Sequence, residues 1–266
     1  YNSIDLNPGA GTHMVTTTNG FTFVSRFDSD GNFEDASIIE WNSFASNIVS
    51  AGLESGSDGV VYLAGTFYDG ADFDPSGGIF TMNVVGQQKN IFMLKMDSIG
   101  TLHWAQQITG LSNCNNIGID ENQALYVNGS TRYNYVSDFD PSGMTYNLQQ
   151  DAVQFTAKYN SNGAFVWAAG IGDYVSGSGV FAPKVNSFSV SRSGESFIGG
   201  QFKNRTAYTY DFNPDSVEVS NIFCYGTSNQ SDGDGFLYKL TTYPVSVNEL
   251  NEQTIKMDVY PNPVNN

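Results

Sequence analysis

Aspartates recur along this chain in one short motif, and they are the residues best suited to chemistry. The fullest copy, Tyr-Asp-Gly-Ala-Asp-Phe-Asp-Pro-Ser-Gly at 68–77, places its carboxylates two or three residues apart. Ca²⁺ takes about six to eight oxygen ligands, and closely spaced carboxylates in a Gly-rich loop can supply several of them. The candidate calcium ligands are Asp69, Asp72, Asp74, Asp138, Asp140, Asp211 and Asp215.

A structural role accounts for the same aspartates without a metal. Asp or Asn ahead of Pro forms an Asx-turn, and proline fixes φ at the corner. No copy matches the EF-hand pattern, and the copy at Asp5-Leu6-Asn7-Pro8 retains a single carboxylate. We therefore weigh the turn-forming role above calcium binding, and we keep calcium as the one candidate cofactor.

Other catalytic constellations have little support in the sequence. The only histidines, His13 and His103, lie beside neither a cysteine nor an acidic cluster with metal-ligand spacing. There is no Gly-x-Ser-x-Gly elbow, no P-loop and no Gly-x-Gly-x-x-Gly between a strand and a helix. A pair of carboxylates for glycoside chemistry stays open, because the fold sets their separation. We expect a protein that is not an enzyme.

The Asp motif is one part of a longer repeat. Its Asp-x-Asp/Asn-Pro corner begins at Asp5, Asp72, Asp138 and Asp211. After each corner comes an alternating strand with one basic residue, at Phe21–Phe27, Ile91–Met96, Val153–Tyr159 and Phe236–Leu240. Ahead of three corners lie strand pairs split by polar turns, at 48–53 and 60–67, 117–120 and 124–130, and 187–191 and 196–202. This alternation with Gly, Asn and Asp turns is typical of antiparallel hairpins.

A four-stranded unit of this kind cannot bury its faces alone, and several stacked units indicate a β-propeller. The order of its motifs resembles the SBBP repeat, a bacterial repeat of the seven-bladed propeller type, over roughly residues 1–242. We therefore expect an all-β fold with four-stranded antiparallel blades, seven when complete and about three and a half in this chain. The expected parts are a half blade at 1–40 and blades at 41–110, 111–172 and 173–242.

The last residues differ from the repeat. The run Met-Asp-Val-Tyr-Pro-Asn-Pro at 257–263 resembles the opening strand of the C-terminal sorting domain of type IX secretion cargo in Bacteroidota. We interpret 243–266 as a linker and the first strand of such a domain, truncated here. The resemblance implies the type IX secretion machinery as a partner and a secreted or cell-surface location. Since the chain opens at Tyr1 within a repeat, we expect a processed or truncated product.

Composition narrows the partners. The net charge is −16 with only 11 Lys and Arg, so we expect neither nucleic acid nor an anionic membrane as a partner. No apolar stretch is long enough for a membrane span. The two cysteines, Cys114 and Cys224, occupy different places in their repeats, and we expect two unpaired thiols.

Aromatic and hydroxyl residues supply further candidates. Trp104 and Trp167 recur at one place per repeat, which is typical of core packing. The candidate ligand-binding residues, expected in exposed loops, are Trp41, Tyr133, Tyr135, Tyr208 and Tyr210. Ser98 and Ser216 follow Asp and precede an aliphatic residue, which resembles the Bacteroidota O-glycosylation pattern.

Together these features predict a non-catalytic scaffold for binding or adhesion, with an unidentified glycan or protein as its ligand. The alternative is a secreted carbohydrate-active or lyase-type enzyme with acidic residues at the propeller channel mouth. A third hypothesis, a structural component of a surface assembly, differs from the first only in its partner. An enzyme should gather unrelated acidic side chains in one pocket, whereas a scaffold repeats the same residues, and this sequence repeats them.

Overall fold

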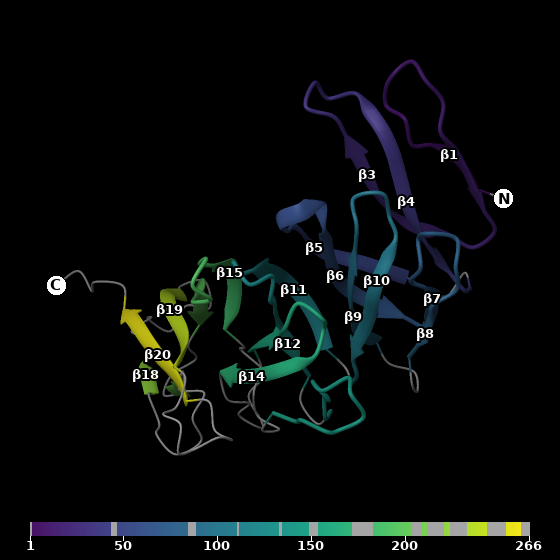
Figure 1. Ribbon diagram of the computed structural model, residues 1–266. Coiled ribbons are helices and arrows are strands. Elements are labelled where there is room, and N and C mark those ends of the chain that lie inside the picture. The colour runs from purple at the N-terminus through teal and green to yellow at the C-terminus, as the bar shows by residue number, and fades with distance from the viewer. Residues whose placement is uncertain are drawn as a thin grey trace. The chain divides into compact units, whose positions relative to one another are not determined.

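The computed structural model describes residues 2–43, 47–84, 89–110, 112–132, 135–148, 154–171, 183–203, 209–211, 221–223, 233–243 and 254–261. Within these ranges the protein is all-β, with one short 3₁₀ turn, η1, at Ser57–Gly59 and no α-helix. The chain divides into two compact units, Tyr1–Cys114 and Asn115–Asn266. Figure 1 follows the strands along both units.

The first unit contains three antiparallel sheets. β1 (Asn2–Asp5) and β2 (Met14–Thr17) form a two-stranded sheet. A second sheet has the order β3 (Phe21–Phe27), β4 (Phe33–Trp41), β7 (Gly70–Asp72) and β8 (Thr81–Asn83). The third has the order β10 (Leu102–Ile108), β9 (Lys89–Met96), β6 (Val61–Tyr68) and β5 (Asn47–Ser55). This third sheet is the four-stranded meander that the sequence predicts for one repeat.

The remaining strands form two further meanders and a small hairpin. One sheet has the order β11 (Ser112–Ile119), β12 (Leu125–Thr131), β13 (Gln154–Tyr159) and β14 (Phe165–Ile171). The other has the order β15 (Lys184–Val190), β16 (Ser196–Lys203), β19 (Gly233–Tyr243) and β20 (Thr254–Pro261). β17 (Thr209–Asp211) pairs with β18 (Asn221–Phe223). The expected all-β fold of four-stranded antiparallel sheets is confirmed, and the sheets are compatible with propeller blades.

β20 comes from the segment that resembles a sorting domain. It pairs with β19 along its length, with Lys239 opposite Asp258, and supplies the fourth strand of the last sheet. The blade expected at 173–242 had no fourth strand of its own. The fourth strand of this sheet therefore lies beyond the expected boundary at residue 242. The resemblance of the segment to a sorting domain stays a prediction.

Each Asp corner begins in a small hairpin that precedes the third strand of its repeat. β1–β2, β7–β8 and β17–β18 are such hairpins, and an isolated bridge between Asp138 and Asn147 marks the fourth. β1–β2 and β17–β18 each form a separate two-stranded sheet. β7 instead extends the β3–β4 hairpin, since Ala71 pairs with Trp41. The corner is thus a regular hairpin that recurs in each repeat.

Two hydrophobic clusters form the cores of the units. In the first, Phe73 of the corner lies 5.0 Å from the ring of Phe92 and 5.1 Å from that of Phe67. In the second, Trp167 is buried and meets Tyr126 edge-on with ring centroids 6.1 Å apart. Trp104 is half-buried and meets Tyr62 in the same way at 6.2 Å. The predicted core-packing role is confirmed for Trp167, whereas Trp104 packs against Tyr62 outside the two clusters.

The Gly that ends each second strand has a packing reason. Gly65, Gly129 and Gly200 lie directly opposite Phe92, Phe155 and Phe236 of the third strand. A Cβ on Gly65 would lie 2.8 Å from a ring carbon of Phe92 and 2.2 Å from the carbonyl oxygen of Val49. Glycine leaves the room in which the phenylalanine ring packs.

Within the described ranges, no helix has the length and apolar character needed to cross a bilayer.

Candidate functional site

The corner carboxylates bind the backbone of their own loops. Asp72 accepts hydrogen bonds at Oδ1 from the N–H of Asp74 (3.1 Å) and of Phe80 (2.8 Å). The N–H of Phe73 donates to the carbonyl of Phe80 at 2.9 Å. One oxygen therefore joins the two ends of the loop, and Phe73 is carried into the core with no exposed surface.

The other described corners repeat this geometry. Asp138 accepts from the N–H of Asp140 (3.1 Å) and Tyr146 (2.9 Å), and Asp5 accepts from that of Asn7 (3.0 Å) and His13 (2.8 Å). A second Asx-turn follows at Asn7, Asp74 and Asp140. The residue between the two turns is buried in each copy, as Leu6, Phe73 or Phe139. The corners therefore do what Asx-turns do.

The remaining candidate metal ligands lie apart from this arrangement. Asp69 has a positive φ of 67° and accepts a hydrogen bond from the hydroxyl of Ser43 at 2.5 Å. Asp211 ends β17, and Asp215 lies outside the described residues. Across the described residues, no group of three His, Cys, Asp or Glu side chains is placed to hold a metal. Calcium binding stays a prediction.

A melting experiment separates the two roles of the corners. Calcium binding predicts that EGTA lowers the melting temperature, because removing a ligand of the folded state destabilises it. The turn role predicts that EGTA has no effect and that an Asp72→Asn, Asp138→Asn double variant melts within about 2 °C of the parent, because an amide oxygen accepts the same backbone bonds. We expect the second pattern in calorimetry. A fall of several degrees with EGTA would contradict it.

The hairpin turns use the same chemistry. Asp97 accepts at Oδ1 from the N–H of Ile99 (3.0 Å) and Thr101 (2.8 Å), and Asp28 accepts from that of Asp30 (2.9 Å) and Asn32 (2.8 Å). The backbone hydrogen bond from Thr101 lowers the pKa of Asp97 most. For Asp28, the hydrogen bond from the Asn32 side chain lowers the pKa most. For Asp5, the hydrogen bond from the backbone N–H of His13 lowers the pKa most.

These lowered pKa values predict acid lability. A carboxyl whose pKa is lower in the folded state than in the unfolded state stabilises the fold at pH values above its ordinary pKa, which is 3.8 for these aspartates. This stabilisation is lost as the pH falls through the folded-state pKa. We expect urea midpoints to be flat near pH 6 and to fall below about pH 4. A triple variant, Asp5→Asn, Asp28→Asn and Asp97→Asn, should have a shallower fall. An equally steep fall in the variant would assign the acid lability to other groups.

The basic residue of each third strand stabilises its sheet. Lys158 lies 3.0 Å from a carboxylate oxygen of Asp120 and 4.8 Å from the ring centroid of Tyr126. The Lys95 ammonium lies 5.2 Å from the ring centroid of Tyr62, and Lys239 lies 3.1 Å from Glu195. Burial beside Asp120 also raises the pKa of Tyr126, so its hydroxyl stays protonated. The lysine ammonium groups of these three strands therefore contact neighbouring carboxylates and aromatic rings within their own sheets.

The structure places the aromatic candidates differently from one another. Tyr135 lies in the loop after β12, is 39% exposed and has the Arg132 guanidinium 5.7 Å from its ring centroid, so its expected exposed-loop position is confirmed. The expectation of a loop position is wrong for Trp41. It ends β4, is half-buried and packs on Gly20, because β4 pairs there with β7. Tyr210 lies in β17, and Tyr133 and Tyr208 lie outside the described residues.

Sequence reasoning missed the apolar side chains of the corner loops. Ile79 is 85% exposed in one loop and Met144 is 71% exposed in another, and each has aromatic neighbours that are also exposed, Phe80 and Tyr146. Exposed apolar side chains in loops are frequent at interaction surfaces. The available signal was an apolar and an aromatic residue within each of the otherwise polar turns that follow Pro75 and Pro141.

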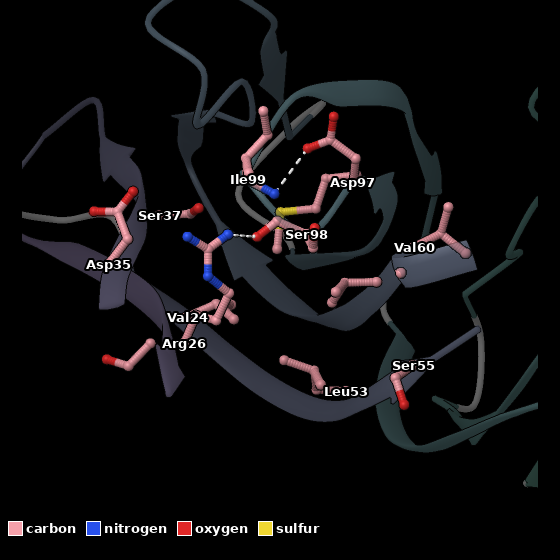
Figure 2. A pocket seen from close by; sticks show the side chains of 14 residues that line it. Val24, Arg26, Asp35, Ser37, Leu53, Ser55, Val60, Asp97, Ser98 and Ile99 are labelled. Carbon is pink, nitrogen blue, oxygen red and sulfur yellow. Dashed lines mark hydrogen bonds between the residues drawn. The ribbon is translucent and has the colours of Figure 1, made fainter. Parts of the chain in front are cut away.

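A cavity of about 270 Å³ lies in the first unit, beside the β3–β4 hairpin (Figure 2). Its apolar lining includes Val24, Leu53 and Met96, and its polar lining includes Arg26 and Asp35. The guanidinium of Arg26 pairs with Glu34 at 2.7 Å and donates a hydrogen bond to the carbonyl of Ser98. The lining comes from three segments far apart in the sequence, which explains why the motifs did not reveal it.

The remaining candidates are the serines, histidines and cysteines noted in the sequence. Ser98 is exposed in the β9–β10 turn, and Ser216 lies outside the described residues, so glycosylation stays a prediction. His103 is exposed, and His13 lies 4.0 Å from Asp35. Cys114 is buried and forms no disulfide among the described residues, and burial raises the pKa of its thiol to about 12. Cys224 lies outside the described residues.

No protein-family model matches this chain, and no curated protein matches it.

Proposed function

We propose that this protein is a secreted or cell-surface scaffold for binding or adhesion, built as a β-propeller of the SBBP type and exported by the type IX secretion system. Its ligand contacts lie in the corner loops, and it has no catalytic role. The complete ring has seven blades.

One observation carries the binding role. In each described corner loop of the second and third repeats, the carboxylates bind backbone N–H groups while apolar side chains point to solvent, chiefly Ile79 and Met144. The acidic residues that could do chemistry are thus engaged in holding the loop, and the exposed surface suits contact with a ligand. The repeated use of the same residues supports a scaffold over the alternative enzyme.

The test uses mucin as the probe, because mucin presents both glycan and protein surfaces. We expect the full chain to be retained on immobilised mucin. An Ile79→Ser, Met144→Ser variant should lose most of this retention. The matched control is Ile99→Ser, which removes a 68% exposed isoleucine from a hairpin turn outside the corners. Retention is measured by surface plasmon resonance, together with reducing sugar released from soluble mucin.

Equal retention of the corner variant and the control would overturn the corner loops as the binding surface. Release of reducing sugar would overturn the non-catalytic proposal and favour the carbohydrate-active alternative. Peptide mapping of the protein from its source tests export separately. We expect glycan mass on the peptide that carries Ser98, and a bare peptide from native material would contradict it.

A further inference from the structure

β3 is an edge strand, unlike its counterparts in the other sheets. The third strand of each complete meander is flanked on both sides: β9 lies between β6 and β10, β13 between β12 and β14, and β19 between β16 and β20. β3 pairs with β4 alone, at the end of its sheet (Figure 1). No described strand takes the place beside β3 that the second strand of the repeat takes elsewhere.

The side chains of β3 are exposed where their counterparts are buried. Phe23 is 46% exposed, whereas the residues at its place in the repeat, Phe92, Phe155 and Phe236, are 0%, 1% and 6% exposed. Phe27 is 45% exposed, whereas Met96, Tyr159 and Leu240 are 3%, 0% and 2% exposed. Burial of these positions therefore depends on the elements that β3 lacks, and the sequence of β3 retains the residues suited to it.

The register of the complete sheets specifies the missing strand. An aromatic residue lies directly opposite the basic residue in all three, with Tyr62 opposite Lys95, Tyr126 opposite Lys158 and Phe197 opposite Lys239. Three positions further along, glycine lies opposite the phenylalanine. A strand that pairs with β3 in this register needs an aromatic residue opposite Arg26 and a glycine opposite Phe23.

The cavity beside β3 lies where that aromatic residue would enter. In the second unit, Tyr126 packs against Trp167, under Lys158, and its hydroxyl lies 3.0 Å from the carbonyl oxygen of Gly194. The corresponding places in the first unit line the cavity: Arg26 for Lys158, Asp35 for Trp167 and Gly59 for Gly194. Figure 2 shows the Arg26 side chain in this space, beside Ser98.

We propose that the free edge of β3 binds an antiparallel β-strand with the pattern aromatic–aliphatic–small–glycine, whose aromatic side chain fills the cavity over Arg26 and whose glycine receives Phe23. The partner is a β-hairpin of the same repeat type, an assignment that rests on the proposed propeller repeat. A second copy of the chain does not fit, because each described strand with this pattern, β6, β12 and β16, is already paired on both sides. Main-chain pairing supplies affinity, and the alternate side chains supply specificity.

The probe is a fluorescent peptide of residues 112–131, the β11–β12 hairpin, with Cys114→Ser. We expect it to bind the full chain in an anisotropy titration. A matched peptide that also carries Gly129→Val should bind about tenfold more weakly or worse, because valine meets the ring of Phe23. On the protein, Phe23→Lys should weaken binding to a similar degree, and Leu237→Lys, at an equally exposed strand position of β19, should leave it unchanged. Circular dichroism confirms that both variants fold.

Three results would overturn the proposal. One is no binding of the probe up to about 1 mM, which is weaker than about 4 kcal/mol of binding free energy. Another is equal binding of the probe and the Gly129→Val peptide, or equal binding to the parent and Phe23→Lys. The third is concentration-dependent dimerisation of the chain alone that Phe23→Lys abolishes, which would assign the β3 edge to a second copy.

Discussion

Replacing Asp120 by alanine is expected to lower the free energy of unfolding of the second unit by about 3–5 kcal/mol. The Asp120 side chain is only 2% exposed and lies 3.0 Å from the ammonium of Lys158, which is itself 19% exposed. Its other oxygen accepts from the N–H of Asn122 and of Ala124, both at 3.0 Å. Removing it leaves a largely buried ammonium without its counter-charge and two turn donors without an acceptor.

The effect is measured by amide hydrogen exchange in β12 and β13, which reports on the second unit alone. Asp120→Asn should lie between the alanine variant and the parent, because its amide oxygen keeps the turn bonds while the ion pair is lost. The matched control is Asp97→Ala in the first unit, where the carboxylate also accepts two backbone hydrogen bonds in a hairpin turn. Asp97 is less buried than Asp120, so a smaller loss of stability is expected. Equal losses at both sites would show that the turn bonds, rather than the buried ion pair, carry the stability.

Gly65→Ala is expected to cost about 1–3 kcal/mol or more in the first unit, although only one methyl group is added. The new Cβ would lie 2.2 Å from the carbonyl oxygen of Val49, 2.8 Å from Cα of Ser50 and 2.8 Å from a ring carbon of Phe92. The ring can turn away, but the backbone of β5 must shift, and β5 pairs with β6 along its length.

Hydrogen exchange in β6 and β9 measures this loss. Gly235→Ala is the matched control, because its Cβ would meet nothing closer than 3.8 Å and its backbone lies in a strand. We expect no large loss there. A Gly65→Ala protein as stable as the parent would mean that β5 and β6 tolerate a wider separation than the packing of Phe92 indicates.

Much of this fold follows from the sequence, because its signals are local. Alternation of apolar residues predicts Phe21–Phe27 as a strand, and β3 has these bounds. Asp, Asn and Gly in the turns predict hairpins, since an Asx oxygen needs only backbone two to four residues away, as Asp97 and Asn160 show. The repeat of these short-range patterns was sufficient to predict four-stranded antiparallel sheets.

The candidate site depended on information that no local pattern contains. Asp97 and Asp120 serve the same kind of turn, yet only Asp120 is buried against a lysine, because β13 brings Lys158 to it from 38 residues away. Trp41 lies in a paired strand because β7 pairs with the end of β4. The cavity lies beside the unpaired edge of β3, where Asp35 takes the place in the repeat that Trp167 takes in the second unit. The sequence alone determined the strands and turns, whose energies arise between near neighbours. Only the tertiary structure decided which side chains are buried, because burial depends on strands distant in the sequence.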